Sequence, residues 1–203
     1  MGPKQRIGCL CLPFLALLCV GWADSWDEIR AAAGSVQTVQ ADFVQEKQMP
    51  ILSRPLVSKG RFYFRTPRSL RWEYLEPVQS ILVMHDGRVT RFVADETGWR
   101  SERGPGLEAM QIVLQEISLW LAGRFDENPS FEAQLESERR IVLTPRQEAF
   151  GAVIQRIVLQ LGTQPGTIES VVIHESQDTF TRLTFNQTQL NPVLQDAVFT
   201  EVP

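Results

Sequence analysis

The chain has 203 residues, of which 43% are hydrophobic, and its 24 acidic residues outnumber its 20 lysines and arginines. A chain of this length has enough residues to bury a sizeable core in one domain. Because it is acidic and has no basic run, we expect no binding to nucleic acid or to an anionic membrane surface through electrostatic attraction.

The first 23 residues have the pattern of a secretory signal peptide. Lys4 and Arg6 precede an apolar run over residues 7–20, and small residues stand three and one positions before Asp24. This run is shorter than the roughly 20 apolar residues that a membrane-spanning helix needs. We therefore expect export, with cleavage before Asp24.

All the cysteines of the chain, Cys9, Cys11 and Cys19, lie in this segment. The mature chain, residues 24–203, therefore has no cysteine for a disulfide or for a thiolate metal site. A lipoprotein signal has a small residue before its cysteine, whereas Leu18 precedes Cys19, so we expect a soluble mature protein. It carries 18 basic and 24 acidic residues, and no linker or repeat divides it, so we expect a single domain.

The mature chain begins with a pattern that predicts a short amphipathic helix over residues 24–34. Asp24 or Ser25 is its expected cap, and Gly34 ends its apolar stripe. Residues 36–48 alternate between apolar and polar side chains, as a half-buried strand does.

An aromatic hairpin over residues 58–77 is the stretch around which we expect the fold to be organised. Its two strands flank the tight turn Thr66-Pro67-Arg68-Ser69. By the two-residue period of a strand, one face of the hairpin is aromatic and apolar and the other carries arginines. The aromatic face consists of Phe62, Phe64, Leu70, Trp72 and Tyr74. It needs an apolar cover, either from the protein or from a ligand.

A second hairpin is predicted from residues 79–84 and 88–94. His85-Asp86-Gly87 lies between their alternating patterns, and Asp-Gly is a strong signal for a tight hairpin turn. Residues 97–102 follow as a further short strand.

Residues 107–124 form the one long helical pattern of the mature chain. Apolar side chains recur at spacings of three and four, and Gly123 is expected to end the helix. The stripe consists of Leu107, Met110, Val113, Leu114, Ile117, Trp120 and Leu121. Further apolar residues beside it make the apolar face wider than one-sided packing requires.

From Phe131 onward the period returns to two. Strands are expected over residues 131–135, 140–144, 153–161, 167–175, 179–185 and 197–201. The chain then has about eleven or twelve strands in an antiparallel meander, and a sheet of that size curves instead of staying flat. The predicted fold is mainly β with α, a curved sheet whose concave side is covered by helices.

No sequence motif for catalysis or for metal binding stands out. His85 falls in a predicted turn, and His174 is followed on a strand by Glu175, which points to the opposite face. We interpret both histidines as surface residues and expect no catalytic residue, no metal and no cofactor.

Short motifs occur in order along nearly the whole mature chain. They are Phe43-Val44-Gln45, Gly60-x-Phe62, Pro67, Leu70-x-Trp72, Pro77, Ser80-Ile81-Leu82-Val83, Asp86-Gly87, Val142-Leu143-Thr144-Pro145, Gly166-Thr167-Ile168 and Phe199. As a set they resemble the periplasmic outer-membrane lipoprotein carriers, the LolA-like proteins. The resemblance implies a single half-open β-barrel of about 11 antiparallel strands, with a helical lid over an apolar concave face that takes up acyl chains.

From this resemblance we expect a cavity lined by the aromatic hairpin and by the lid helix. The expected lining is Phe62, Phe64, Trp72 and Tyr74 on the sheet, with Met110, Leu114, Ile117, Trp120 and Leu121 on the lid. A permanently closed core would show the same stripes, so that alternative stays open. The carriers often have an arginine before the turn proline that holds the lid by hydrogen bonds. Here Thr66 takes its place as the expected lid contact.

The resemblance implies a periplasmic carrier with three kinds of partner. These are an acylated lipoprotein or other lipid as cargo, an inner-membrane lipoprotein-release transporter and an outer-membrane receptor of the LolB type. We expect a monomer, because direct handover needs an unblocked mouth. Two alternatives remain: a periplasmic lipid-binding or sensor module of the same fold that binds a lipid or a protein, and an esterase-like enzyme.

Overall fold

The computed structural model of the chain describes residues 25–102, 116–137 and 139–201. The strands of its first half are β1 (Thr38–Gln48), β2 (Leu56–Arg65), β3 (Ser69–Glu76), β4 (Ser80–His85), β5 (Arg88–Asp95) and β6 (Gly98–Glu102). Those of its second half are β7 (Phe131–Glu136), β8 (Arg140–Pro145), β9 (Arg156–Leu161), β10 (Ile168–His174) and β11 (Phe180–Leu190). The helices are α1 (Trp26–Gly34), α3 (Glu148–Gly151) and α4 (Ala197–Thr200), and residues 116–121 are also helical.

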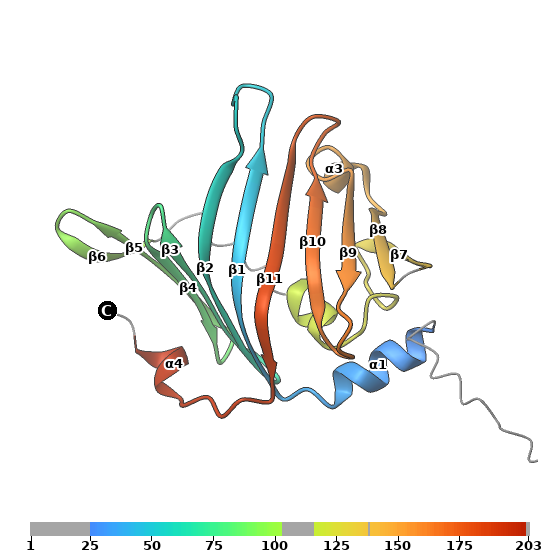
Figure 1. Cartoon of the computed structure of the whole chain (residues 1–203), viewed down its shortest axis with the longest axis horizontal. Helices are drawn as coiled ribbons and strands as arrows, with labels where there is room; N and C mark the ends of the chain where they lie inside the picture. Colours follow the sequence, from blue (N-terminus) through green and yellow to red (C-terminus); the bar gives the residue numbers. More distant parts are fainter. Residues whose placement is uncertain (1–24, 103–115, 138, 202–203) are drawn as a thin grey trace, which may run out of the picture.

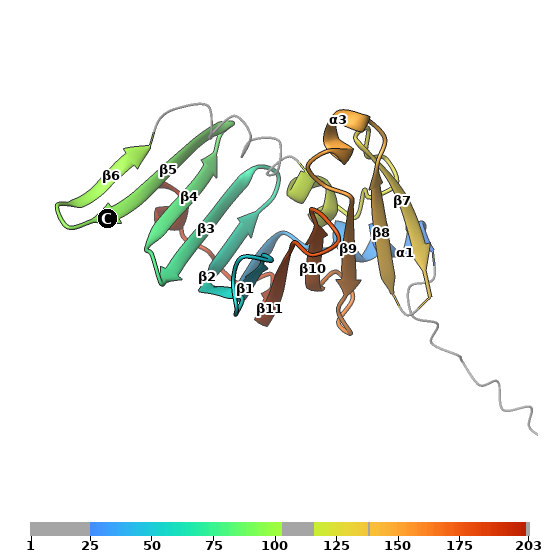
Figure 2. The ribbon, with the colours of Figure 1, turned by 90° about the horizontal axis from the view of Figure 1, so that it is seen from above.

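The eleven strands of the described ranges form one antiparallel sheet (Figure 1) in the order β6-β5-β4-β3-β2-β1-β11-β10-β9-β8-β7. The chain runs outward from β1 at the centre to β6 at one edge, then passes to β7 at the other edge and returns to β11 beside β1. Figure 2 shows the sheet bent into an arc, with the helix of residues 116–121 on its concave side. The edge strands β6 and β7 are not neighbours, so the sheet stays open. The predicted curved meander of about eleven strands is confirmed.

Turn chemistry places the hairpins where the sequence predicted them. Asp86 and Gly87 have φ angles of 49° and 76°, as a two-residue hairpin turn between β4 and β5 requires. Across β2 and β3, Phe62 pairs with Trp72 and Phe64 with Leu70. The predicted aromatic face of this hairpin therefore exists, and it is turned toward the concave side.

The helices begin and end at the expected residues where the structure describes them. Ser25 caps α1, because its Oγ accepts a hydrogen bond of 3.3 Å from the Glu28 N–H. Gly123, at a φ of 70°, ends the helix of residues 116–121, and the N–H groups of Gly123 and Arg124 donate back to carbonyls one turn earlier. Residues 107–115 of the predicted lid lie outside the described ranges, so a complete lid stays a prediction. Within those ranges, no helix has the length and apolarity needed to cross a membrane.

One predicted strand is wrong. Residues 197–201 are not a strand: α4 covers Ala197–Thr200 and packs on β3 and β4. Helix α4 lies against β3 and β4, which are interior strands, so no sheet edge is beside it with which a strand could pair. One helical turn satisfies its backbone and directs Phe199, which is 2% exposed, onto the sheet.

Candidate functional site

One wall of the site is a cluster of aromatic rings on β1, β2 and β3 that packs around Gly60. Phe43 of β1 pairs with Gly60 of β2, and a Cβ atom on Gly60 would lie 2.6 Å from the Phe43 ring and 2.0 Å from the Glu73 carbonyl oxygen. With no side chain at position 60, the Phe43 ring reaches across β2 to β3. Its centroid lies 5.2 Å from those of Trp72 and Tyr74.

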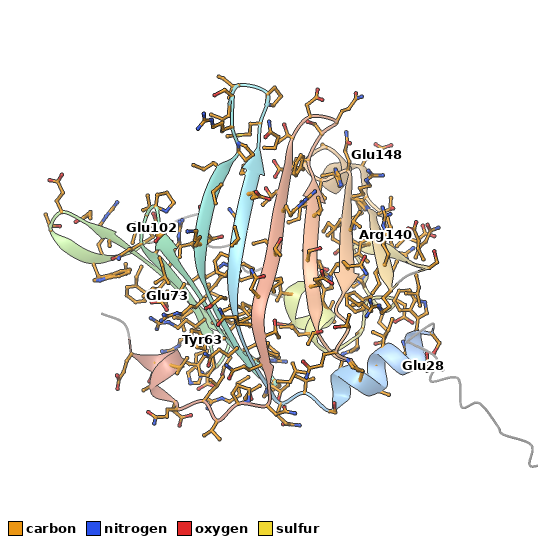
Figure 3. The ribbon with its side chains drawn as sticks, viewed as in Figure 1. Glu28, Tyr63, Glu73, Glu102, Arg140 and Glu148 are labelled. Atoms are coloured by element: carbon orange, nitrogen blue, oxygen red, sulfur yellow. The ribbon has the colours of Figure 1, made fainter. Side chains whose placement is uncertain are left out.

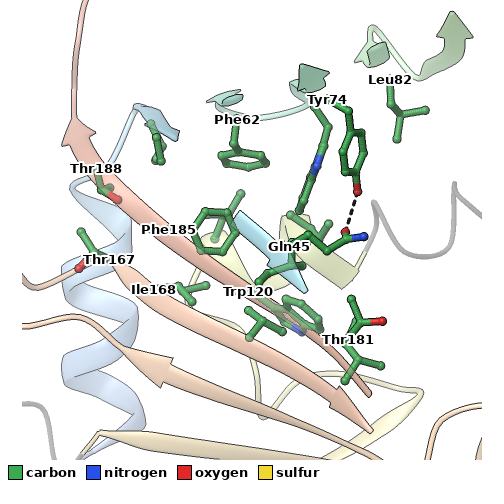
Figure 4. Close-up of a pocket in the computed structure, with 18 of the residues that line it drawn as sticks. Gln45, Phe62, Tyr74, Leu82, Trp120, Thr167, Ile168, Thr181, Phe185 and Thr188 are labelled. Atoms are coloured by element: carbon green, nitrogen blue, oxygen red, sulfur yellow. Dashed lines mark hydrogen bonds between the residues drawn. The ribbon is translucent and has the colours of Figure 1, made fainter. Parts of the chain in front are cut away.

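The cluster continues toward β11 through edge-to-face contacts. The Phe62 and Trp72 rings meet at 5.2 Å and 76°, and Phe185 of β11 lies 5.9 Å from Phe62. Such tilted contacts between aromatic rings are favourable beyond the area they bury. Together the rings form one wall of the cavity, in which Phe62, Tyr74 and Phe185 are labelled in Figure 4.

A cavity of about 290 Å³ lies between this wall, strands β10 and β11, and the helix of residues 116–121. This volume is near the lower end of the roughly 300–1,000 Å³ that small-molecule pockets span. The apolar part of its lining is Val39, Ala41, Phe62, Trp72, Tyr74, Leu82, Ile117, Trp120, Leu121, Ile168, Val171, Ile173, Leu183, Phe185 and Leu190. Helix α1 and the turn between β9 and β10 border a smaller pocket of about 60 Å³ that shares Trp120 and Leu121.

The polar side chains at the cavity are few and mostly paired. The Tyr74 hydroxyl donates a 2.8 Å hydrogen bond to Gln45 Oε1, drawn in Figure 4. Burial raises the pKa of Tyr74, so the phenol stays neutral. Arg91 also lines the cavity, and its guanidinium donates to Glu102 at 2.9 Å. The charge in the wall is therefore compensated.

The structure brings together six of the nine residues predicted to line the cavity. These are Phe62, Trp72, Tyr74, Ile117, Trp120 and Leu121. Phe64, which belongs to the core cluster and pairs with Leu70, is not among the residues that line the cavity. Met110 and Leu114 lie outside the described residues. Lipid binding by any of them stays a prediction.

Thr66, the predicted lid contact, lies at an exposed turn away from the cavity lining. Its Oγ1 donates to Gln37, whose backbone oxygen and Oε1 both lie 3.3 Å away. Gln37 belongs to the connection between α1 and β1. This position ties the β2–β3 turn to that connection, and a contact of Thr66 with the lid stays a prediction.

Sequence reasoning missed the second wall of the cavity, which comes from β10 and β11. Ile173 and Phe185 are examples, and each belongs to an alternating apolar pattern that the sequence does show. The missing information was the pairing of β11 with β1, which brings residues 180–190 beside the aromatic hairpin.

Both histidines of the chain lie on the convex face, away from the cavity. His174 alternates with Ile173, which lines the cavity, and burial together with nearby arginines lowers its pKa. His85 Nδ1 lies 2.9 Å from Ser69 Oγ, and its ring stacks on Phe199 of α4. Figure 3 looks onto this face, where Tyr63, Glu73 and Arg140 are labelled. Among the described residues, no cluster of three or more His, Cys, Asp or Glu could hold a metal ion.

Over residues 34–201 the chain matches the family described as outer membrane lipoprotein carrier protein LolA. The chain belongs to the LolA family. A relative from Methylococcus capsulatus named outer-membrane lipoprotein carrier protein is 27% identical over 199 residues, which cover 93% of this chain and 91% of the relative. The resemblance found in the sequence motifs is thereby confirmed.

Two solved structures of MucB share the LolA-family fold. The MucA/MucB complex of Pseudomonas aeruginosa matches with a TM-score of 0.53 at 15% identity, over 87% of this chain and 60% of that one. MucB alone gives a TM-score of 0.52 at 17% identity, over 87% and 62%. This chain thus spans about three-fifths of the MucB chains, and at such identity the likeness concerns the fold.

Proposed function

We propose that this protein is a periplasmic carrier that binds the acyl chains of lipoproteins. It receives them from an inner-membrane release transporter and passes them to an outer-membrane receptor of the LolB type. The apolar cavity of about 290 Å³ between the sheet and the helix of residues 116–121 is the observation that carries this proposal. Membership of the LolA family supports it.

The energetics of acyl chains favour direct handover. Each methylene buried from water contributes about 0.8 kcal/mol, so exposing one long chain costs on the order of 10 kcal/mol. Free release into water is therefore too slow to be useful. The carrier must open its cavity against that of its partner, and a monomer leaves the cavity mouth accessible for this step.

Co-purification with a lipoprotein tests the proposal. An acylated lipoprotein released from membranes beside the mature protein should form a soluble complex with it. Trp120→Glu places a charge in the apolar wall and should abolish the complex. Trp99→Glu is the matched control, because Trp99 lies on the edge strand β6 outside the cavity lining. Persistent absence of a complex with the wild-type protein contradicts the proposal.

A second candidate is a sensor or interaction module with the same fold. MucB, which shares the fold, was solved in complex with MucA. A stable complex of this protein with a membrane-protein ectodomain, formed equally with and without lipid, would favour this candidate over the carrier.

We propose further that the protein acts without catalysis. The support is the position of both histidines on the convex face, on the side of the sheet away from the cavity. Hydrolysis of a long-chain acyl ester that disappears in His174→Ala would contradict this.

A further inference from the structure

The connection between β1 and β2, together with the first residues of β2, exposes a cluster of apolar side chains. We call this segment, residues 49–57, the apolar tip. Of the six large hydrophobic side chains that are exposed in the described ranges, three lie here: Ile51, which is 88% exposed, Leu56 and Val57. Single exposed apolar residues are ordinary on a protein surface, whereas a cluster of them marks an interaction site.

A tight turn projects Ile51 away from the sheet. The Leu52 N–H donates to the Met49 carbonyl oxygen at 3.0 Å, so Pro50 and Ile51 occupy the two central positions of a β-turn, and proline is favoured at the first of them. Met49 and Leu52 are half-buried, whereas Pro50 and Ile51 are exposed. Figure 1 shows this connection at the top of the molecule, beyond the ends of β3 and β11. The turn itself therefore presents Ile51 to the surroundings.

The charges of the apolar tip differ from those of the whole chain. Residues 49–57 contain no Asp or Glu, and their one charged side chain, Arg54, is exposed. Lys47 and Lys59, which flank the tip along the chain, are paired with Glu175 and Glu76. The tip is thus locally basic on a chain with a net charge of −4. It carries no negative charge that would be repelled by the phosphates of lipid headgroups.

We propose that the apolar tip inserts into the interface of a lipid bilayer and docks the protein on the membrane surface. Ile51 enters the boundary between headgroups and acyl chains, and Arg54 stays among the headgroups, where a long cationic side chain is favourable. A narrow apolar projection suits a fluid layer that adapts to it, whereas a protein partner needs a matching groove. The inference goes beyond the proposed function, because no residue of the tip lines the cavity.

Flotation with phosphatidylcholine vesicles tests the docking. The wild-type mature protein should float with the vesicles. Ile51→Asp should lower the partition coefficient about tenfold or more, because burying one isoleucine side chain contributes at least that factor. It should leave the free energy of unfolding nearly unchanged, because the side chain is exposed. Val193→Asp is the matched control: Val193 is 97% exposed on the connection between β11 and α4, and this variant should float as the wild type does.

A fluorescent label provides a second measurement that introduces no charge at the tip. Residues 24–203 contain no cysteine, so Ile51→Cys and Val193→Cys can each be labelled at a single site with a nitrobenzoxadiazole dye. Phosphatidylcholine vesicles should shift the emission of the dye at position 51 to the blue and increase its intensity. The dye at position 193 should keep its emission in water.

The contrary outcomes are distinct. A wild-type protein that does not float, with an unshifted dye at position 51, overturns the inference and leaves the tip to a protein partner. Flotation that appears only when phosphatidylglycerol is added, and that Ile51→Asp leaves unchanged, overturns it in favour of charge attraction. A lipid-free dimer that Ile51→Asp converts to a monomer overturns it in favour of a second copy of the chain. None of these measurements uses cargo, so the carrier proposal is tested separately by co-purification with a lipoprotein.

Discussion

A helical segment packs on each face of the curved sheet, but the two contacts differ in how completely they are filled. On the convex face, α4 places Phe199 over β3 and β4, where Ile81 is fully buried and Phe199 is 2% exposed. On the concave face, the helix of residues 116–121 contributes Ile117, Trp120 and Leu121, and a cavity of about 290 Å³ remains beneath it.

Polar contacts reinforce the packing of α4 on the convex face, which we call the convex seam. Arg71 Nη1 donates to the carbonyl oxygens of Val198 and Glu201, at 3.3 and 2.9 Å. The Arg65 guanidinium lies 4.7 Å from the Phe199 ring centroid and donates to Asp196 at 2.6 Å. The convex contact is thus a closed structural seam. Among the described residues, the concave contact leaves an apolar cavity, whereas the convex contact is filled by Phe199.

The largest expected effect comes from removing an aromatic ring from each face. Phe199→Ala should lower the free energy of unfolding by about 3 kcal/mol, because a tightly packed ring is lost. Phe185→Ala should cost clearly less, because its partly exposed ring already borders open space. Urea denaturation of the two variants measures the difference. Equal losses would mean that the concave side is as closed as the convex one.

Adding bulk should give the opposite contrast. Val83→Phe overfills the convex seam, where Val83 is 6% exposed, and should lower the free energy of unfolding by about 1–3 kcal/mol without changing lipid uptake. Ile173→Phe extends into the cavity, so it should leave stability nearly unchanged and weaken uptake of an acyl probe. Denaturation and probe titration on both variants check this. If Ile173→Phe lowers the free energy of unfolding and leaves probe uptake normal, there is no free space beside Ile173 and this prediction is wrong.

The smallest effect concerns a buried carboxyl at the base of the concave helix. Burial raises the pKa of Glu116 above the ordinary value of a glutamate, although the Asn128 amide donates to its Oε2. A carboxyl with a raised pKa in the folded state contributes stability below its unfolded pKa, and loses that contribution as pH rises through the folded value. Glu116→Gln should therefore stabilise the protein at pH 8 relative to wild type, with the gain shrinking toward pH 4.

Thermal unfolding across this pH range measures the effect of Glu116→Gln. Glu132→Gln, an exposed change on β7, serves as the control. If the gain in stability of Glu116→Gln over wild type is the same at every pH, then burial of the charged carboxylate is not its cause.

Local features of the site were predictable from sequence because they depend on neighbouring residues. The alternation that joins Phe62 with Trp72, the turn at Asp86-Gly87 and the helix end at Gly123 are all of this kind. The second wall depends on β11 returning to β1 across more than 130 residues, which no local pattern encodes. Alternation also predicted a strand over residues 197–201, where the structure has α4, because the packing of Phe199 on the sheet determines the conformation of this segment.

Whether an apolar stripe is core or cavity was the question that the sequence left open. Phe62 and Phe64 are two residues apart on one face of β2 and each is 3% exposed, yet only Phe62 also lines the cavity. Their neighbours differ: Phe64 pairs with Leu70, whereas Phe62 pairs with the cavity-lining Trp72 and lies 5.9 Å from the cavity-lining Phe185 of β11. The alternation of a strand predicts which face a side chain lies on, but it does not predict whether a cavity remains beside that side chain.

Native mass spectrometry of the protein purified from the cells that produce it, together with titration of an environment-sensitive acyl probe, tests the central claim most directly. The account predicts bound lipid or lipoprotein in the spectra, and a probe that enters the cavity of the emptied protein and is displaced by cargo. A protein that is empty as purified and that excludes the probe would show that the concave side is closed in solution, which would contradict the carrier proposal.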